Sequence, residues 1–492
     1  MRFSREGALF DGRTASIEIP SAPGLEVGGA DFTLSLWVRT EKDLDDTLGD
    51  LISKYDPARR TGLNLTIQHN AGTGSQSNYR NLHFGIDQAR QDAAWTDRGR
   101  PGKAIFIHSL AVHEGHLYAG TVEGRTNDDH GHVFRYADGE KWEDLGAPWR
   151  SNGVTAMASY NGHLYVGVSR VLLHYSGLEP TLAHHIGGKV FRYENGKWID
   201  LGQILGIDGV NGMVVFRGKL YVTGFYQPGM FRYEGGTEWA SLGTPEGKRP
   251  EGLIVRDGAI YATGYDEGAV YRFDGEKWTH TGRLGDSTQV YGQGIYRGKH
   301  LAGTWAFGEV FRHEGDGHWE SAGRLRDAEE VMGPAGYNGM FYVGTLPLAE
   351  IFRYDGDRRW TSMGRVDTTP DVKYRRAWSM AVFDGKLFAG TLPSGHVWSF
   401  EAGRSATYDR ELAAGWRHIA AVREGIRLRL HVDGKVVAQS AEFDPGHYDL
   451  TNTIPWQIGF GQHDYFNGTA RDVRLYTQAL SAAEVIALAG KR

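Results

Sequence analysis

Apolar and small residues alternate with polar ones in short runs along most of the chain, and the runs end in turn pairs such as NG, DG and RG. A period of two is typical of strands with one buried face, and these turn pairs favour tight hairpins. Ser481 with Glu484 forms a capping box that predicts one short terminal helix. The pattern therefore predicts an all-β protein built from short antiparallel strands.

Between residues 92 and 402 the strand pattern is repetitive. Each unit contains a phrase like LYAGT and then a phrase like VFRY, which begins seven times, at Val133, Val190, Met230, Val270, Val310, Ile351 and Val397. Four strands in roughly 40 residues match the period of a β-propeller. We predict a seven-bladed propeller and order the four strands of each blade from the axis outward.

A Trp begins the predicted outermost strand of the first six units: Trp142, Trp198, Trp239, Trp278, Trp319 and Trp360. No such phrase follows the seventh unit, whereas AAWTDRG stands alone ahead of the array at residues 93–99. We expect residues 94–98 to supply the missing outer strand of the seventh blade, with Trp95 as the seventh Trp. This pairing would remove the exposed strand edges that an open array leaves.

The segments on either side of the repeats, residues 1–91 and 403–492, have a different character. The first contains FDG, IEIP and FTLSLWV, and the second contains WRHIAAVREG, LRLHVDGKVVA and RDVRLYTQALSAAEV. Together they resemble a single laminin-G or concanavalin A-like jelly roll. The resemblance implies a β-sandwich interrupted by the propeller. The propeller units resemble kelch blades only loosely, because the double Gly after the second strand is missing, and no residue role is carried over.

The strand order also predicts where the jelly roll sits. We define the upper face of the propeller as the one where the innermost strands begin. The chain enters the propeller through an outermost strand and leaves it through a third strand, so both connections lie at the lower end of the seventh blade. We expect the jelly roll at the lower outer edge of that blade, with the upper mouth free.

Composition excludes several classes of function. The formal net charge of −6 offers no basic face for nucleic acid. The absence of Cys excludes disulfides, thiolate metal sites and cysteine nucleophiles. No stretch approaches the roughly 18 apolar residues of a membrane span. Residues 1–20 lack the apolar segment of a leader peptide, so the sequence leaves localisation open, as it does the oligomeric state.

Ligands of propellers are expected where loops converge on the upper mouth. The starts of the innermost strands carry dissimilar residues although the repeat is otherwise regular, which indicates a site. From these positions and the ends of the second strands we predict ligand contacts by Asn211, Tyr226, Asp266, Trp305, Trp378, Arg170 and Glu123.

Four further residues of this face are candidates for general acid–base chemistry: His108, Glu251, Tyr291 and Arg376. A His, Tyr and Arg set suits β-elimination on a uronate, with Arg376 neutralising the carboxylate. Paired carboxylates such as Glu251 and Asp266 suit glycoside hydrolysis. The alternative is a channel simply lined by polar groups.

Three long loops fall on neighbouring blades one, two and seven, which predicts an off-axis site on that side. Two of the loops carry His130, His132, His184 and His185, candidate ligands of a divalent metal. In the jelly roll, Asp11 and Asp472 are candidates for a structural Ca²⁺, as the resemblance implies; capping of turns is the alternative. No cofactor is required by any motif.

Taken together, these features favour a carbohydrate-active or glycan-binding protein with its ligand at the upper mouth, including a polysaccharide lyase or hydrolase. The jelly-roll sheet could add platforms for a glycan at Trp37, His83 and Trp456. Two alternatives stay open: a non-catalytic interaction or adhesion module, and a metal-assisted enzyme using the loop histidines.

Overall fold

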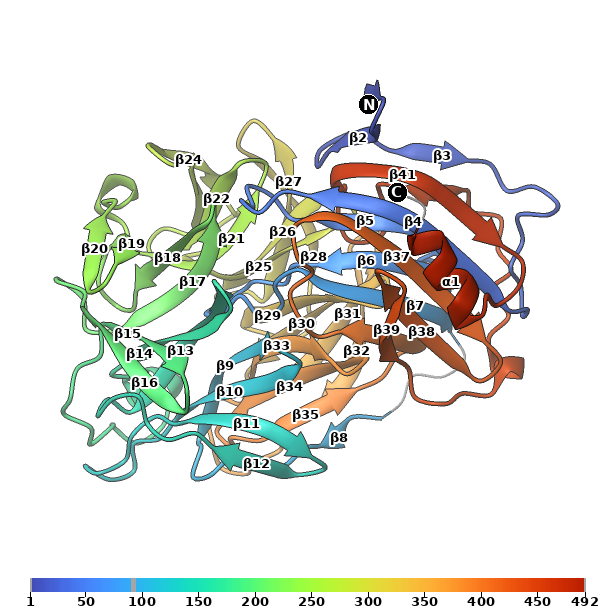
Figure 1. Cartoon of the computed structure of the whole chain (residues 1–492). Coiled ribbons are helices and arrows are strands. Elements are labelled where there is room, and N and C mark those ends of the chain that lie inside the picture. Colours follow the sequence, from blue (N-terminus) through green and yellow to red (C-terminus); the bar gives the residue numbers. More distant parts are fainter. Residues whose placement is uncertain (1, 90–93, 491–492) are drawn as a thin grey trace.

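The computed structural model describes residues 2–89 and 94–490 and contains two all-β parts that lie side by side (Figure 1). Two antiparallel sheets form a sandwich from the chain's two ends. The first sheet has the order β1 (Arg2–Ser4), β2 (Gly7–Asp11), β41 (Asn467–Tyr476), β4 (Phe32–Thr40), β37 (Gly415–Glu424), β38 (Arg427–Val432) and β39 (Lys435–Gln439). The second has the order β3 (Ile17–Ile19), β40 (Trp456–Ile458), β5 (Gly49–Asp56), β6 (Thr61–Gln68), β7 (Asn81–Gln88) and β36 (Arg404–Tyr408).

The sandwich core forms because alternate residues of the two sheets face each other. Leu34 and Leu36 of β4 pack in one buried cluster with Leu63 and Leu65 of β6 and Phe84 of β7. The predicted terminal helix is present as α1 (Ala482–Ala489), and Ser481 and Glu484 form its capping box. Each sheet mixes strands from both ends of the chain, which is the jelly roll that the sequence predicts.

The rest of the described chain forms a propeller of four-stranded antiparallel units. Units one to three are β9 (Phe106–His113), β10 (His116–Val122), β11 (Val133–Asp138) and β12 (Lys141–Asp144); β13 (Gly153–Tyr160), β14 (His163–Ser169), β15 (Lys189–Glu194) and β16 (Lys197–Gln203); and β17 (Val210–Phe216), β18 (Lys219–Gly224), β19 (Met230–Gly235) and β20 (Glu238–Ser241). Units four and five are β21 (Pro250–Arg256), β22 (Ala259–Gly264), β23 (Ala269–Phe273) and β24 (Trp278–Arg283); and β25 (Gln289–Tyr296), β26 (Lys299–Trp305), β27 (Glu309–Gly315) and β28 (His318–Arg324). Units six and seven are β29 (Glu330–Tyr337), β30 (Met340–Leu346), β31 (Glu350–Gly356) and β32 (Arg359–Arg365); and β33 (Arg376–Phe383), β34 (Lys386–Leu392), β35 (Val397–Phe400) and β8 (Thr96–Asp97).

The last of these units is completed by the N-terminal strand. β8 pairs with β35 through Asp97 opposite Trp398 and Thr96 opposite Ser399. The predicted boundary between residues 91 and 92 falls outside the described residues. The predicted boundary between residues 402 and 403 falls between β35 and β36.

A single hydrogen bond recurs between the outer strands of neighbouring units. The indole N–H of Trp142 donates to the carbonyl of Arg98 at 2.8 Å, and that of Trp95 donates to the carbonyl of Met363 at 3.0 Å. The same bond is made by Trp198, Trp239, Trp278, Trp319 and Trp360 to the preceding unit. The repeated Trp therefore joins each unit to its neighbour, and Trp95 closes the circle.

The jelly roll is not confined to the edge of the seventh unit, which corrects our expectation. It covers the lower face, where the hairpins between first and second strands meet it: Glu114 pairs with Arg410, the Arg217 N–H donates to the Leu44 carbonyl at 2.7 Å, and the Gly258 N–H donates to the Asp45 carbonyl at 2.7 Å. Chain connectivity determines only that the jelly roll is attached at the seventh unit. The extent of its interface with the propeller depends on the polar groups that pair across the two surfaces.

The loop between β6 and β7, residues 69–80, enters the propeller channel from below. The Gln76 N–H donates to the Met157 carbonyl at 3.0 Å, and the Val112 N–H donates to the Ser77 carbonyl at 2.9 Å. At the tip, a Cβ on Gly74 would lie 2.7 Å from the Thr155 carbonyl oxygen, so the approach requires glycine. We call residues 69–80 the plug.

Candidate functional site

The upper mouth is built from the first residues of the innermost strands, as the sequence predicts. His108 is the third residue of β9, Glu251 the second of β21 and Tyr291 the third of β25. Asn211 and Trp378 occupy the matching positions of β17 and β33. Because the repeat places these positions around one axis, residues far apart in the chain share a site.

Polar atoms of this region are buried without a hydrogen-bond partner among the described residues. They come from five different units and are His108 Nε2, Asn211 Nδ2 and Oδ1, Glu251 Oε2, Glu330 Oε1, Arg376 Nε and Trp378 Nε1. His108 and Glu251 are only 1% and 2% exposed. An unpartnered buried polar atom costs about 1–3 kcal/mol, so these atoms are candidates for contacts with other groups. Unpartnered atoms also occur around the plug, for example His69 Nδ1 and Gln76 Oε1.

Charged residues at the mouth form two ion pairs, and one carboxylate, that of Glu251, takes part in neither. Arg376 Nη2 lies 3.3 Å from Glu330 Oε2, and Arg249 Nη2 lies 2.5 Å from Asp266 Oδ1. The Asp266 carboxylate also accepts the backbone N–H of Arg249 at 3.0 Å. No ion pair is found for Glu251 in the part of the chain that the structure describes.

These surroundings shift the pKa values of Glu251 and Asp266 in opposite directions. Burial raises the pKa of Glu251 to about 8, and the negative charge of Glu330 adds to the rise. The hydrogen bond from Arg249 lowers the pKa of Asp266. Two carboxyls shifted in opposite directions are the pattern of a general acid beside an ionised group.

Aromatic side chains form the rim above these groups. Tyr226, Tyr265, Tyr291 and Trp305 are half-buried. The rings of Tyr265 and Tyr291 lie 6.0 Å apart, and the guanidinium of Arg249 lies 4.2 Å from the ring centre of Tyr265. Half-buried aromatic faces are the usual stacking surfaces for ligands.

The four candidate catalytic residues lie in this one region, but two of them are poorly suited to elimination. His108 Nδ1 lies 3.0 Å from the Thr155 carbonyl, and burial lowers the pKa of His108 to about 3. Burial raises the pKa of Tyr291 well above its ordinary value, so the phenol keeps its proton at neutral pH. Arg376 is held by Glu330 and by Ser176 Oγ at 2.7 Å.

Two predicted ligand residues lie outside this group. Burial raises the pKa of Glu123, and the charges that act on it, His132 and Asp129, belong to the loop of the first unit. Arg170 faces Asp208 at 4.0 Å. Trp305 does join the mouth, because its backbone pairs with that of Glu330.

Sequence reasoning missed Glu330 and Arg249, although a signal was present. Arg249 lies two residues before the predicted Glu251, and Arg376 lies two residues before the predicted Trp378. Glu330 likewise lies two residues before Met332, which stands at the matching position of β29. Because strand side chains alternate, residues two apart share a face. The mouth is therefore two residues deep on each innermost strand. The plug forms its floor, as Gly72, Thr73 and Gly74 line a small cavity with His108 and Trp378.

The long loops of units one, two and seven enclose a separate cavity of about 600 Å³ beside the mouth. Its lining is mainly apolar and consists of Ile105, Gly124, Arg125, Leu173, Leu178, Glu179, Pro180, Leu182, Thr369, Val372 and Pro393. The predicted clustering of these loops on one side is present, but their histidines do not line the cavity.

The metal hypotheses do not fit the geometry. Among the described residues, no three His, Asp or Glu side chains are grouped to hold a metal ion. His132 Nδ1 instead lies 2.9 Å from Asp144 Oδ1, and neither His130 nor the pair His184 and His185 completes a ligand set. Burial lowers the pKa of His130, and the charges of His132 and His185 lower it further, so the two loops do bring these imidazoles near one another without forming a ligand group.

The predicted calcium pair, Asp11 and Asp472, is also not formed. Asp11 lies opposite Asn467 in the β2–β41 ladder, five residues along the strand from Asp472. Its Oδ1 accepts the backbone N–H groups of Arg13, Thr14 and Ala15 at 2.9 Å each. Asp11 therefore caps a turn, which was the alternative interpretation.

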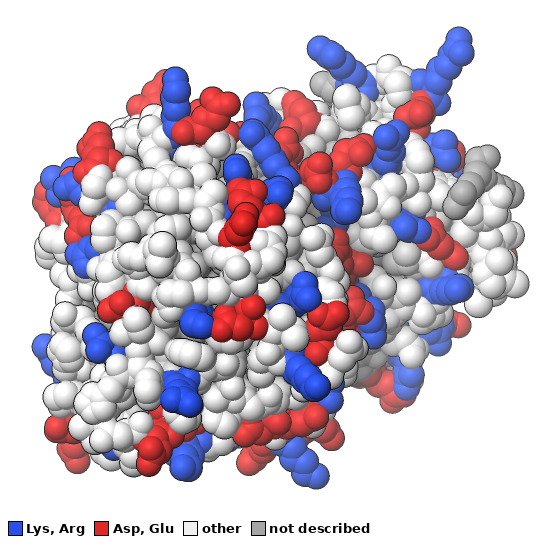
Figure 2. All heavy atoms as spheres, turned by 60° about the vertical axis from the view of Figure 1, so that its left-hand side comes forward, with Lys and Arg blue, Asp and Glu red and all other residues white. Residues whose placement is uncertain are grey.

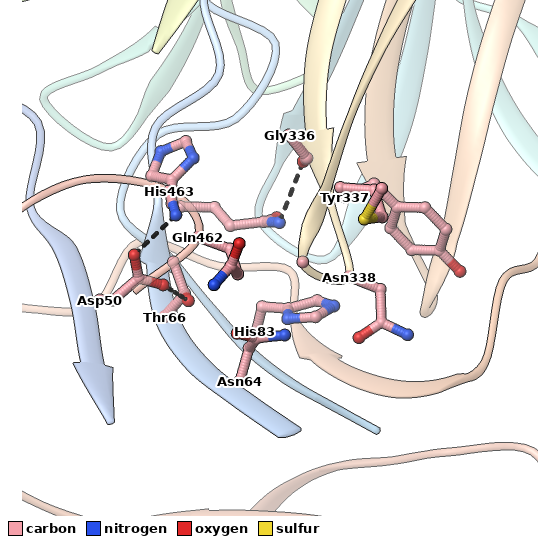
Figure 3. A pocket seen from close by; sticks show the side chains of 12 residues that line it. Asp50, Asn64, Thr66, His83, Gly336, Tyr337, Asn338, Gln462 and His463 are labelled. Carbon is pink, nitrogen blue, oxygen red and sulfur yellow. Dashed lines mark hydrogen bonds between the residues drawn. The ribbon is translucent and has the colours of Figure 1, made fainter. Parts of the chain in front are cut away.

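The jelly-roll sheet offers no open platform for a glycan. Trp37, His83 and Trp456 are all buried. His83 lies with Asp50, Asn64 and Thr66 on the face of β5–β7 that the β29–β30 hairpin covers (Figure 3). Asp50 Oδ2 accepts the His463 N–H at 2.7 Å there.

The surface of the propeller side carries Lys, Arg, Asp and Glu interspersed, without a large field of one sign (Figure 2). In the described chain, the terminal helix and the short helical turns all fall well below the length and apolarity that crossing a bilayer requires.

Comparisons with known proteins support the architecture. A laminin-G family model, described as "Concanavalin A-like lectin/glucanases superfamily", matches residues 359–486. No curated protein matches the chain.

Similar solved structures are propellers at low identity. They include a catalytically inactive variant of virginiamycin B lyase from Staphylococcus aureus with quinupristin (12% identity, 63% of this chain and 98% of that chain, TM-score 0.46). YCF48 bound to D1 peptide (11%, 64% and 99%, 0.47) and the Cps50 (Swd1) β-propeller domain of Myceliophteria thermophila (12%, 61% and 98%, 0.44) are also similar. At this identity the similarity concerns the fold alone.

Proposed function

We propose that the protein binds a glycan or a sugar-like small molecule at the upper mouth of the propeller. One observation carries the proposal: buried, unpartnered donors and acceptors from five units converge beneath a rim of half-buried aromatic rings. A hydroxyl-rich ligand supplies both donors and acceptors, and its ring faces stack on Tyr and Trp. The lower face is covered by the jelly roll, so a ligand would enter from the upper face, where the loop of the second unit packs against Trp378 and Arg376.

The proposal is tested with a glycan array and calorimetry on the full chain. Wild type should bind at least one glycan class, and Trp305→Ala should weaken that binding about 5- to 20-fold, the effect of about 1–2 kcal/mol of stacking. Trp142→Ala is the matched control, because that indole joins two outer strands far from the mouth. Absence of any glycan binding, or equal losses in the two variants, would contradict the proposal.

Hydrolysis of the bound glycan is a second candidate, favoured by the opposite pKa shifts of Glu251 and Asp266. Glu251 would protonate the leaving oxygen as the glycosidic bond breaks, and a water would add to the anomeric carbon and pass its proton to the ionised Asp266. Release of new reducing ends from a bound polysaccharide would support it, with loss of turnover in Glu251→Gln. Binding without turnover would leave the protein a glycan-binding module.

A further inference from the structure

The charges of the mouth do not balance. Glu251, Glu330 and Asp266 provide three carboxylates, whereas Arg249 and Arg376 provide two guanidinium groups. Both arginines are ion-paired with the other two carboxylates, so the group carries one excess negative charge when all are ionised, and Glu251 is the carboxylate without an ion pair among the described residues. The positive charge of Arg249 lowers the pKa of Glu251 from a distance, but burial outweighs this effect. A buried carboxylate is stable in its ionised form only when a cation approaches it.

The groups around Glu251 suit a cation. Tyr226, Tyr265 and Tyr291 stand on the same and the two neighbouring units as Glu251, at the same end of the channel. Burial raises the pKa of all three phenols, and the nearby charge of Glu251 raises it further. The three rings are therefore neutral, and their faces attract a positive charge.

We propose that the glycan bound at the mouth carries a cationic amine, as in a sugar with a free amino group, and that Glu251 and the surrounding tyrosines recognise this amine. The inference rests on the proposed function. The ammonium would pair with Glu251 Oε2, which has no other partner among the described residues, while the hydroxyls use the remaining unpartnered atoms. Glu330 Oε1 is a second acceptor in reach of the same site.

The same geometry argues against an acidic ligand. A uronate would have to face Glu251, and the two arginines that could neutralise it are already held by Asp266 and by Glu330. Opening the Arg376 pair would leave the buried carboxylate of Glu330 without its counter-charge, which is strongly destabilising. Neutral N-acetylated sugars carry no positive charge and therefore cannot form an ion pair with Glu251.

The experiment uses matched pairs of oligosaccharides that differ only in N-acetylation, built from glucosamine, galactosamine or mannosamine. Affinities are measured by calorimetry with the full chain at neutral pH. Wild type should bind the free-amine member of at least one pair tenfold or more tightly than its N-acetyl counterpart. Glu251→Gln should reduce this preference to less than threefold. Tyr265→Leu should weaken binding of the free-amine form by about 3- to 10-fold.

Glu123→Gln is the matched control, since it removes a buried carboxyl of the same face that lies outside the mouth group, and it should keep the preference. Thermal unfolding checks that each variant is folded. If Glu251→Gln does not fold, Tyr265→Leu is the variant that tests recognition of the amine. Equal or tighter binding of the N-acetyl or uronate forms by wild type would overturn the inference alone. A wild type that binds no glycan of any kind would overturn the proposed function and the inference with it.

Discussion

The two ends of the propeller channel are contacted by different parts of the chain: the jelly roll and the plug meet the lower end, and the long loops of units one, two and seven lie at the upper end. At the lower end, the plug's Asn78 donates to the Val382 carbonyl at 2.8 Å and accepts the Val382 N–H at 3.0 Å. Asn338 similarly donates to the carbonyls of Ile86 and Ala402. At the upper end, Asn211 and Glu251 keep unpartnered atoms. The plug and its surroundings keep unpartnered atoms as well, such as Gln76 Oε1 and Asn338 Oδ1, so the two ends differ in what contacts them and not in how completely their polar groups are paired.

The largest expected loss of stability lies at the lower end. Asn78→Ala removes both hydrogen bonds to Val382 and leaves its backbone groups buried, so the free energy of unfolding should fall by about 2–4 kcal/mol. Chemical denaturation measures the change, and the exposed Asn127→Ala is the control, expected to be within about 0.5 kcal/mol of wild type. Equal stability of the two variants would show that the plug contributes nothing to the interface.

At the upper end, stability should depend on pH through Glu251. Its pKa is raised to about 8 in the folded chain, so folding favours the protonated form, and the free energy of unfolding falls as pH rises from about 4.5 to 8. Glu251→Gln removes this loss. The variant should gain about 4 kcal/mol relative to wild type between pH 5 and pH 9, as measured by denaturation at each pH. The buried carboxyls of Asp50 and Asp409 titrate in both proteins and cancel in the difference. A constant difference across this range would contradict the burial of an unpaired carboxyl.

A smaller effect is expected for two tryptophan variants, one of which should change ligand affinity and the other the melting temperature. Trp305→Ala should weaken ligand binding by about 1–2 kcal/mol with little change in melting temperature. Trp142→Ala should lower the melting temperature and leave affinity unchanged, because it loses the bond to Arg98. The reverse result would place the ligand away from the mouth.

The smallest expected effect is the change in stability when metal ions or the loop histidines are removed. Treatment with a chelator, and the double variant His130→Ala with His184→Ala, should each change the free energy of unfolding by less than about 0.5 kcal/mol. Neither histidine belongs to a group of ligating side chains in the described chain. A large drop in melting temperature on chelation would reopen the metal-assisted alternative.

The sequence was informative wherever the signal was local or repeated. The Trp phrase predicted both the propeller and the role of Trp95, because each copy makes the same bond. It also identified the mouth positions, since a repeat that breaks its own rule exposes them. It failed for Asp11 with Asp472, where proximity depended on strand register that spacing does not encode.

The position of the jelly roll could not be predicted from connectivity. Glycines 72 and 74 look like ordinary loop residues in the sequence, yet the structure places them in the channel, where Gly74 contacts Thr155. The pairing of Glu330 with Arg376 was equally invisible, because it joins strands of different units.

The sequence by itself determined the strands, the repeated unit, the split sandwich and the residues that face the mouth, because alternation and turn chemistry act over a few neighbouring residues. Only the tertiary structure decided which polar groups find partners. That outcome depends on contacts between units and between the two parts, and it left the lower end closed by the plug and Glu251, at the upper end, without an ion pair among the described residues.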